Sequence, residues 1–76
     1  MIYYYNCDDN QLEAFRECVE KDDAIFRTED KTPIAMIEDD IWIDLDRHIP
    51  IAFEECGIVY DLNTKKKLYY IEEIED

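Results

Sequence analysis

The sequence has few of the residues that build flexible loops and catalytic sites. Its 76 residues include one glycine, two prolines, one histidine and no serine. A serine nucleophile is therefore excluded, and one glycine cannot form a glycine-rich phosphate-binding loop. There is no linker or low-complexity segment, and we find no internal repeat beyond pairs of charges. We expect one acidic domain over residues 1–76, with no catalytic residue and no enzymatic activity.

Basic residues are also scarce. Eight Lys and Arg residues stand against 21 Asp and Glu residues, so the formal net charge is −13. Hydrophobic residues make up 47% of the chain, enough for a folded core, so the charge belongs to a surface. Solubility alone requires a net charge of only about 2–8 in a small domain. Because this surface repels phosphate, we expect a basic protein as partner and no direct contact with nucleic acid.

Membrane and secretory signals are not found in the sequence. No apolar run approaches the length of about 20 residues that spans a bilayer, and no basic segment precedes an apolar run at the start. The odd set of Cys7, Cys18 and Cys56 favours free thiols over a disulfide framework. We therefore expect a cytoplasmic protein that does not bind membranes.

The sequence matches neither a calcium-binding loop nor a zinc site completely. A calcium-binding loop starting at Asp44 would place Asp46 and Glu55 correctly, but its sixth position needs glycine and holds Ile49. Zinc could draw on the three cysteines and His48, but none of these lies within the usual two to four residues of another. We expect no metal and no cofactor, with Cys18 in the core and His48 partly buried for structural reasons.

The N-terminal third predicts one strand and one helix. Residues 1–5 are rich in aromatic and β-branched side chains, which favours a strand. Asp8, Asp9 or Asn10 can then cap a helix that continues to about Lys21. Its apolar face would consist of residues at helical spacing, namely Leu12, Phe15, Cys18 and Val19.

The rest of the chain predicts short antiparallel strands. Charged loops at 28–32 and 63–67 separate pairs of extended segments and indicate hairpins. Residues 49–57 are ambiguous, since they alternate like a strand but carry Pro50 and Gly57 where a short helix would start and stop; we favour a helical turn. The expected fold is α+β, a small antiparallel sheet of hairpins with one amphipathic helix near the N-terminus. The remaining predicted strands cover residues 24–27, 33–37, 41–45, 58–62 and 68–74.

The aromatic residues allow two interpretations. Tyr residues at 3–5 and 69–70 fit a core and a sheet surface, or contact area at an interface. Trp42 lies between Ile41 and Ile43, which would face the other side of a strand, so it could be an exposed anchor or the patch of a dimer. We expect a homodimer from this aromatic content.

The acidic residues are clustered at the ends of the expected elements, whereas three of the eight basic residues stand together at Lys65–Lys67. We expect this lysine turn to lie outside the contact face, or to pair with Glu72 or Glu73 across its hairpin. The predicted partner-binding residues are Asp8, Asp9, Glu29, Asp30, Glu38, Asp39, Asp40, Asp44, Asp46, Glu54, Glu55, Glu72 and Glu73.

In size, acidity and aromatic content the chain resembles the DNA-mimic proteins encoded by phages, and among these the small host-takeover inhibitors of the nucleoid protein HU from lytic Bacillus phages. The resemblance covers the whole chain and is one of composition, without a shared motif. It implies an inhibitor that occupies the DNA-binding surface of a basic host protein, with HU favoured. The alternative is an acidic adaptor or regulatory module that docks on a basic patch unrelated to DNA binding, such as an RNA polymerase subunit, a CRISPR effector or a toxin.

Overall fold

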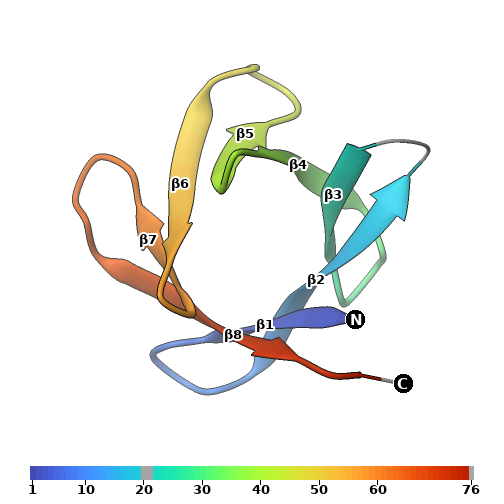
Figure 1. The fold of residues 1–76 in the computed structure, drawn as a ribbon, viewed down its shortest axis with the longest axis vertical. Coiled ribbons are helices and arrows are strands. Elements are labelled where there is room, and N and C mark those ends of the chain that lie inside the picture. Colours follow the sequence, from blue (N-terminus) through green and yellow to red (C-terminus); the bar gives the residue numbers. More distant parts are fainter. Residues whose placement is uncertain (20–21, 76) are drawn as a thin grey trace.

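A computed structural model describes residues 1–19 and 22–75, apart from the side chain of Val19, and these residues form a closed antiparallel barrel. Strands follow one another around the ring in chain order, and β8 closes the barrel by pairing with β1 (Figure 1). The two ends of the described chain lie side by side there, where the Met1 ammonium donates to the Ile74 carbonyl at 2.6 Å. The strands are β1 (Ile2–Asn6), β2 (Leu12–Val19), β3 (Asp22–Arg27), β4 (Pro33–Glu38), β5 (Ile41–Asp44), β6 (Pro50–Glu55), β7 (Ile58–Asp61) and β8 (Lys67–Glu73).

The expected α+β class is wrong, because the described residues are all β with no helix. The segment predicted as an amphipathic helix is strand β2, which pairs with β1 on one side and β3 on the other; its predicted end at Lys21 lies outside the described residues. The residues predicted to cap this helix lie instead in the β1–β2 loop. There Asn6 Oδ1 accepts the N–H of Asp8 at 2.7 Å, and Asp9 Oδ1 accepts the N–H of Gln11 at 2.9 Å. Pairing on both edges of β2 satisfies its backbone groups as fully as a helix would.

The helical turn expected at residues 49–57 is also wrong. Pro50 begins strand β6, where a residue without an N–H is tolerated. Gly57 does not end a helix; with Cys56 it forms the tight β6–β7 turn, in which both residues have positive φ, 50° and 80°. Two consecutive positive φ angles are the geometry of a two-residue hairpin turn. The predicted strands at 1–5, 24–27, 33–37, 41–45, 58–62 and 68–74 are confirmed to within one or two residues at their ends.

An internal repeat, which we did not expect, organises the barrel. The four hairpins β1–β2, β3–β4, β5–β6 and β7–β8 have equivalent loops, closed by N–H to carbonyl bonds of 2.8–2.9 Å between residues 6 and 11, 27 and 32, 44 and 49, and 61 and 66. In each loop the fifth residue has a positive φ, from 57° to 64°. The same pattern recurs after 21, 17 and 17 residues along the chain. The barrel is therefore pseudo-four-fold.

Each hairpin also contains a β-bulge at the equivalent place. The pairing register shifts by one residue after Tyr4, Ile25, Trp42 and Val59. The second strand of each hairpin therefore has one extra residue with no partner on the first strand. Two consecutive residues can then approach the interior, as in the Pro-Ile-Ala sequences at 33–35 and 50–52. The extra residues are Glu13, Ile34, Ile51 and Leu68.

The centre of the core is a layer of inward side chains from all eight strands. Strands β1, β3, β5 and β7 contribute Tyr4, Ile25, Trp42 and Val59, which are between 0% and 2% exposed. Strands β2, β4 and β6 contribute alanines at the equivalent positions, and β8 contributes Tyr69. The Tyr69 ring fills space that the alanines leave, since it stacks on Trp42 with centroids 5.8 Å apart. The core residues contributed by β2, β4 and β6 are Ala14, Ala35 and Ala52.

Three side chains lie elsewhere than their sequence context predicted. Trp42 is 2% exposed, so it is no exposed anchor; Ile41 and Ile43 take the outer face instead. Cys18 is exposed and does not belong to the core, because it lies next to the last residue of β2, beyond the buried part of that strand. His48 is exposed on the β5–β6 loop rather than partly buried. Cys7, Cys18 and Cys56 all lie in the described part of the chain, and no disulfide bond joins them.

Candidate binding surface at the turn end of the barrel

The barrel has two unlike ends. We call the end with the four equivalent loops, at residues 6–11, 27–32, 44–49 and 61–66, the loop end. The other end, which we call the turn end, holds the last residues of β2, the first residues of β3, the β4–β5 and β6–β7 turns and both ends of the described chain. In an up-and-down barrel every second connection lies at the same end, so residues far apart in the sequence gather there.

Charge is distributed unequally between these ends. Among the described residues, the turn end carries eleven acidic side chains and one basic side chain, a net charge of −10, and the loop end carries eight acidic and six basic ones, a net charge of −2. The acidic residues of the turn end are Glu17, Asp22, Asp23, Glu38, Asp39, Asp40, Glu54, Glu55, Glu72, Glu73 and Glu75, and its basic residue is Arg16.

The internal repeat places one glutamate at the equivalent position of every hairpin. Glu17, Glu38, Glu55 and Glu72 lie near the turn-end limits of β2, β4, β6 and β8, and all four are exposed. They recur after 21, 17 and 17 residues, in step with the loops. The turn end is therefore surrounded by a ring of carboxylates fixed to strands, which we call the glutamate ring.

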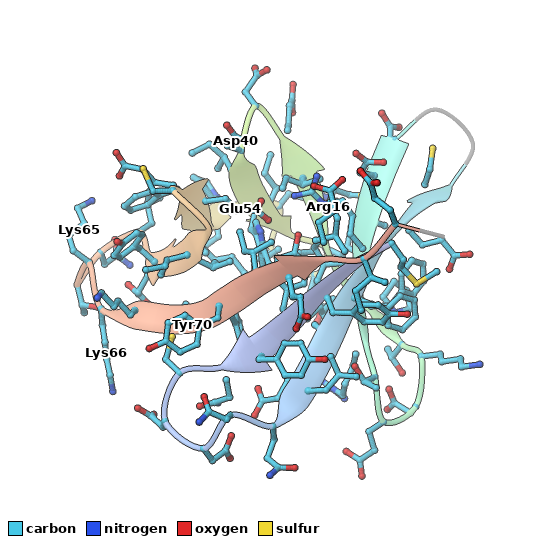
Figure 2. The ribbon with its side chains drawn as sticks, turned by 60° about the horizontal axis from the view of Figure 1, so that its bottom comes forward. Arg16, Asp40, Glu54, Lys65, Lys66 and Tyr70 are labelled. Atoms are coloured by element: carbon cyan, nitrogen blue, oxygen red, sulfur yellow. The ribbon has the colours of Figure 1, made fainter. Side chains whose placement is uncertain are left out.

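Asp39 and Asp40 extend this surface at the tip of the β4–β5 turn. Both are exposed, and their φ angles are 50° and 66°, in a region that Asp and Asn enter more readily than other non-glycine residues. Figure 2 shows Asp40 at the outer end of its turn, on a different connection from Lys65 and Lys66. The lysine loop belongs to the opposite end of the barrel.

The structure divides the predicted partner-binding residues between the two ends. Seven lie at the turn end, and six lie at the loop end, so they do not form one surface. Glu17, Asp22 and Asp23 also lie at the turn end, although the sequence prediction omitted them; correct assignment of β2 and β3 as neighbouring antiparallel strands would have placed them there. The turn-end group is Glu38, Asp39, Asp40, Glu54, Glu55, Glu72 and Glu73, and the loop-end group is Asp8, Asp9, Glu29, Asp30, Asp44 and Asp46.

Several loop-end carboxylates are occupied within their own loops. Asp44 Oδ1 accepts the N–H groups of Asp46 and Arg47 at 2.8 and 3.0 Å, and these bonds, Arg47 first, hold the pKa of Asp44 below its usual range. Hydrogen bonding from Thr32 lowers the pKa of Asp30, again through its own loop. These carboxylates shape the loops, as an Asx turn does.

Unlike these loop-end carboxylates, the carboxylates of the glutamate ring form no ion pair among the described residues. The ion pairs among the described residues are Arg16–Glu54, Arg16–Asp23, Arg27–Asp30 and Arg47–Asp44. Within residues 1–19 and 22–75, none joins a basic residue to a glutamate of the ring or to Asp39 or Asp40. The expected pairing of Lys65–Lys67 with Glu72 or Glu73 is wrong, because the β8 strand separates them; Lys65 instead donates to the Leu62 carbonyl and lies over the Phe53 ring.

Glu54 is the one predicted site residue that lies inside the barrel. Its side chain is 9% exposed and accepts from Arg16 at 2.6 Å, from the Tyr4 hydroxyl at 2.6 Å and from Trp42 Nε1 at 2.8 Å. Figure 2 shows Arg16 and Glu54 directed toward each other. Burial, and then Glu54, raise the pKa of the Tyr4 hydroxyl, which therefore stays a donor. Burial opposes the charge of Arg16, but Tyr4 and Glu54 outweigh it and raise its pKa.

This interior cluster has no charge to offer a partner. The guanidinium and the carboxylate neutralise each other; Arg16 donates to Oε1 of Glu54, and Tyr4 and Trp42 both donate to its Oε2. Its physical effect is to close the barrel beneath the glutamate ring with a fixed set of hydrogen bonds. We therefore assign Glu54 to the support of the turn end and not to its contact surface.

The described residues also bear on metal binding and on membrane insertion. The described residues contain no cluster of three or more His, Cys, Asp or Glu side chains that could hold a metal ion. Nor does that part of the chain contain a helix with the length and apolar character needed to cross a membrane. The chain matches no family model, and no curated protein and no solved structure is found to match it.

Proposed function

We propose that this protein is a non-catalytic inhibitor whose turn end docks on the DNA-binding surface of a basic protein and competes there with DNA. The unequal distribution of charge carries the proposal, since the described side chains at the turn end have a net charge of −10, or −9 with the Met1 ammonium, against −2 at the loop end. Complementary charge mainly raises the association rate and selects partners of the opposite sign. A basic surface is the complement of the turn end.

The density of charge is comparable with that of DNA. The barrel measures 31 × 31 × 23 Å. Duplex DNA carries one charge per about 1.7 Å of axis, hence on the order of 18 charges over the same length, of which one side presents roughly half. A protein that releases counterions when its Lys and Arg residues neutralise phosphates would gain similarly from the turn end.

The rigidity of the turn end supports specific binding. Its carboxylates, apart from that of Glu75, stand on strands of a closed barrel or in tight turns, and the Arg16–Glu54 cluster fixes the strands beneath them. Side chains held on a rigid frame lose less conformational freedom on binding than those of a disordered acidic tail. The proposal therefore concerns a shaped acidic surface.

The resemblance to phage DNA mimics favours an HU-like nucleoid protein as the partner, in a bacterial cytoplasm. A homodimer would present two turn ends to such a partner, and its existence is checked by the molar mass in solution. An adaptor that docks on a basic patch unrelated to DNA binding is the outcome that the following experiment distinguishes.

The test is a competition between this protein and a fluorescent duplex for purified HU, followed by anisotropy at low salt. The variant Glu38→Gln, Asp39→Asn, Asp40→Asn removes three turn-end charges. The matched control Asp8→Asn, Asp9→Asn, Asp46→Asn removes three loop-end charges, so both variants have the same net charge. We expect the wild type and the control to displace the duplex and the turn-end variant to do so at least about tenfold less well.

Two results would contradict the proposal. If both triple variants lose activity equally, net charge and not the turn end governs binding. If HU saturated with duplex still binds this protein with unchanged affinity, the two do not share a surface and DNA mimicry is wrong. Capture of another basic protein that also binds when its nucleic-acid site is filled would indicate the adaptor function instead.

A further inference from the structure

The four hairpins differ from one another at a few positions, and three of these differences meet in one place. The bulged residue is apolar in three hairpins but is Glu13 in the first. The first loop residue is Asn or Asp in three hairpins but is Arg27 in the second. The core position of the second strand is alanine in three hairpins but is Tyr69 in the fourth.

Glu13, Arg27 and Tyr69 all line a single cavity at the loop end. The cavity has a volume of about 370 Å³ and is completed by Leu12, Ala14, Glu29 and Ile34. Its size lies within the range of about 300–1,000 Å³ that is usual for small-molecule sites, and the mouth of a small barrel is a common position for one. Residues that depart from a local pattern and converge on a cavity indicate a site.

The polar side chains of this cavity are oriented by neighbouring residues but keep hydrogen-bonding capacity for a ligand. Asn6 Nδ2 donates to Glu13 Oε1 at 3.0 Å and orients that carboxylate beside Tyr69, whose pKa is raised by burial and then by Glu13. Arg27 makes one contact of 3.4 Å with Asp30, and both side chains are about half exposed, so this pair is weak. No ion pair joins Arg27 to Glu13 among the described residues.

The walls between these charged groups are apolar. Leu12, Ala14 and Ile34 line the cavity together with Tyr69. The ring of Tyr69 is fixed on its other side by Trp42, on which it stacks, and by Tyr4 at 6.4 Å. A carboxylate, a guanidinium and an apolar wall thus face one open space.

We propose that this cavity binds a small zwitterion, an α-amino acid with an apolar side chain. Its ammonium group pairs with Glu13 and Glu29, its carboxylate pairs with Arg27, and its side chain packs against Leu12 and Ile34. A ligand with one charge satisfies only one side of the cavity and leaves the opposite group desolvated and unpaired, which is costly. This site is independent of the turn end and of the proposed DNA mimicry.

The probe is L-phenylalanine, titrated into the ¹⁵N-labelled full-length protein and followed by amide chemical shifts. We expect saturable shifts centred on residues 12–14, 27–29 and 69. Phenethylamine lacks the carboxylate and 3-phenylpropanoate lacks the ammonium group, so each should bind at least about tenfold more weakly. If either analogue binds as well as L-phenylalanine, or if no shifts appear at tens of millimolar, the proposal is wrong.

The internal repeat supplies variants that should still fold. Glu13→Ile and Arg27→Asp each introduce a residue that the equivalent position of another hairpin already carries. Both should reduce the affinity for L-phenylalanine at least about tenfold. The matched controls Asp8→Asn and Arg47→Asp change the charge of the same end by the same amounts outside this cavity and should leave the affinity unchanged. Equal loss in variants and controls would overturn the assignment of the site.

Discussion

Arg16 and Glu54 occupy equivalent positions in the first and third hairpins, and their side chains meet inside the barrel at 2.6 Å. The other two members of this set, in the second and fourth hairpins, are Ile37 and Ile71, which pack against the core. One layer of the pseudo-four-fold barrel therefore contains an ion pair across one diagonal and two isoleucines across the other. This layer supports the glutamate ring and gives the four similar hairpins distinct partners.

Breaking this pair should destabilise the barrel. Arg16→Ile leaves Glu54 buried without its cation and should cost about 3–5 kcal/mol of unfolding free energy. In the double variant Arg16→Ile, Glu54→Ile all four equivalent positions are isoleucine, so the cost should be much smaller than the sum of the single costs. Part of it remains, because the Tyr4 and Trp42 donors lose their acceptor.

Urea denaturation of the two single variants and the double variant measures this coupling. Glu17→Ile, on the exposed side of β2, is the control and should change stability by less than about 0.5 kcal/mol. Additive costs would show that the two side chains do not interact, contrary to the geometry.

Alkaline pH should destabilise the fold through two tyrosines. Burial, and then Glu54 for Tyr4 and Glu13 for Tyr69, raise the pKa of both hydroxyls above the ordinary value of about 10. A pKa that is higher in the folded state favours folding while the group is protonated. This contribution is complete below pH 10 and is lost as the pH rises through the folded-state pKa.

Absorbance of tyrosinate as a function of pH tests this. Two of the six tyrosines should ionise late, together with loss of the near-ultraviolet circular dichroism of the fold. Tyr4→Phe and Tyr69→Phe should each remove one late-ionising group. A titration in which the same two groups ionise before any loss of structure would contradict their burial.

The sequence predicts a strand correctly where the alternation of apolar and polar residues is clear. Strands such as 33–37 and 58–62 were correctly predicted because β-branched and aromatic residues lie between clear turn residues. In β2 the bulge at Glu13 interrupts the period of two, and the spacing of Leu12, Phe15 and Cys18 then imitates a helix. Pairing with two neighbouring strands decided the outcome, and a local pattern does not contain that information.

The internal repeat was visible in the sequence but was missed. Pro-Ile-Ala occurs at 33–35 and again 17 residues later at 50–52, and a glutamate follows three residues after each alanine, at Glu38 and Glu55. Had this repeat been recognised, four hairpins would have been expected and the acidic residues would have been assigned to two ends. The burial of Glu54 beside exposed Glu55 could not have been predicted, because it depends on Arg16 from a distant hairpin.

Salt should stabilise the free protein even though it weakens binding to a basic partner. The carboxylates of the glutamate ring and of Asp39 and Asp40 repel one another across an end about as wide as the barrel, 31 Å. The Debye length is about 30 Å at 0.01 M salt and about 8 Å at 0.15 M, so this repulsion acts at low salt and is screened at the higher concentration.

Thermal unfolding at these two salt concentrations provides the measurement. We expect the Tm to rise by a few degrees with salt, which corresponds to about 1 kcal/mol in a domain of this size. The triple variant Glu38→Gln, Asp39→Asn, Asp40→Asn should show a smaller rise than the loop-end variant Asp8→Asn, Asp9→Asn, Asp46→Asn. Equal responses would contradict the concentration of repulsion at the turn end.

In the β4–β5 turn, the residues that favour partner binding should lower the stability of the fold. Asp39 and Asp40 both have positive φ angles, for which Asn-Gly is the preferred pair, and both add to the repulsion at the turn end. Asp39→Asn, Asp40→Gly should therefore raise the unfolding free energy by about 1 kcal/mol and weaken binding to the basic partner at the same time.

Cys56→Asn is the matched control for this change, because it creates the same Asn-Gly pair in the neighbouring β6–β7 turn, where φ is 50° and 80°, without removing a carboxylate. It should increase stability similarly and leave partner affinity unchanged. Chemical denaturation and the HU competition assay on both variants separate the two effects. If the Asp39, Asp40 variant keeps full affinity, this turn is not part of the contact surface, and the surface must lie on the glutamate ring alone.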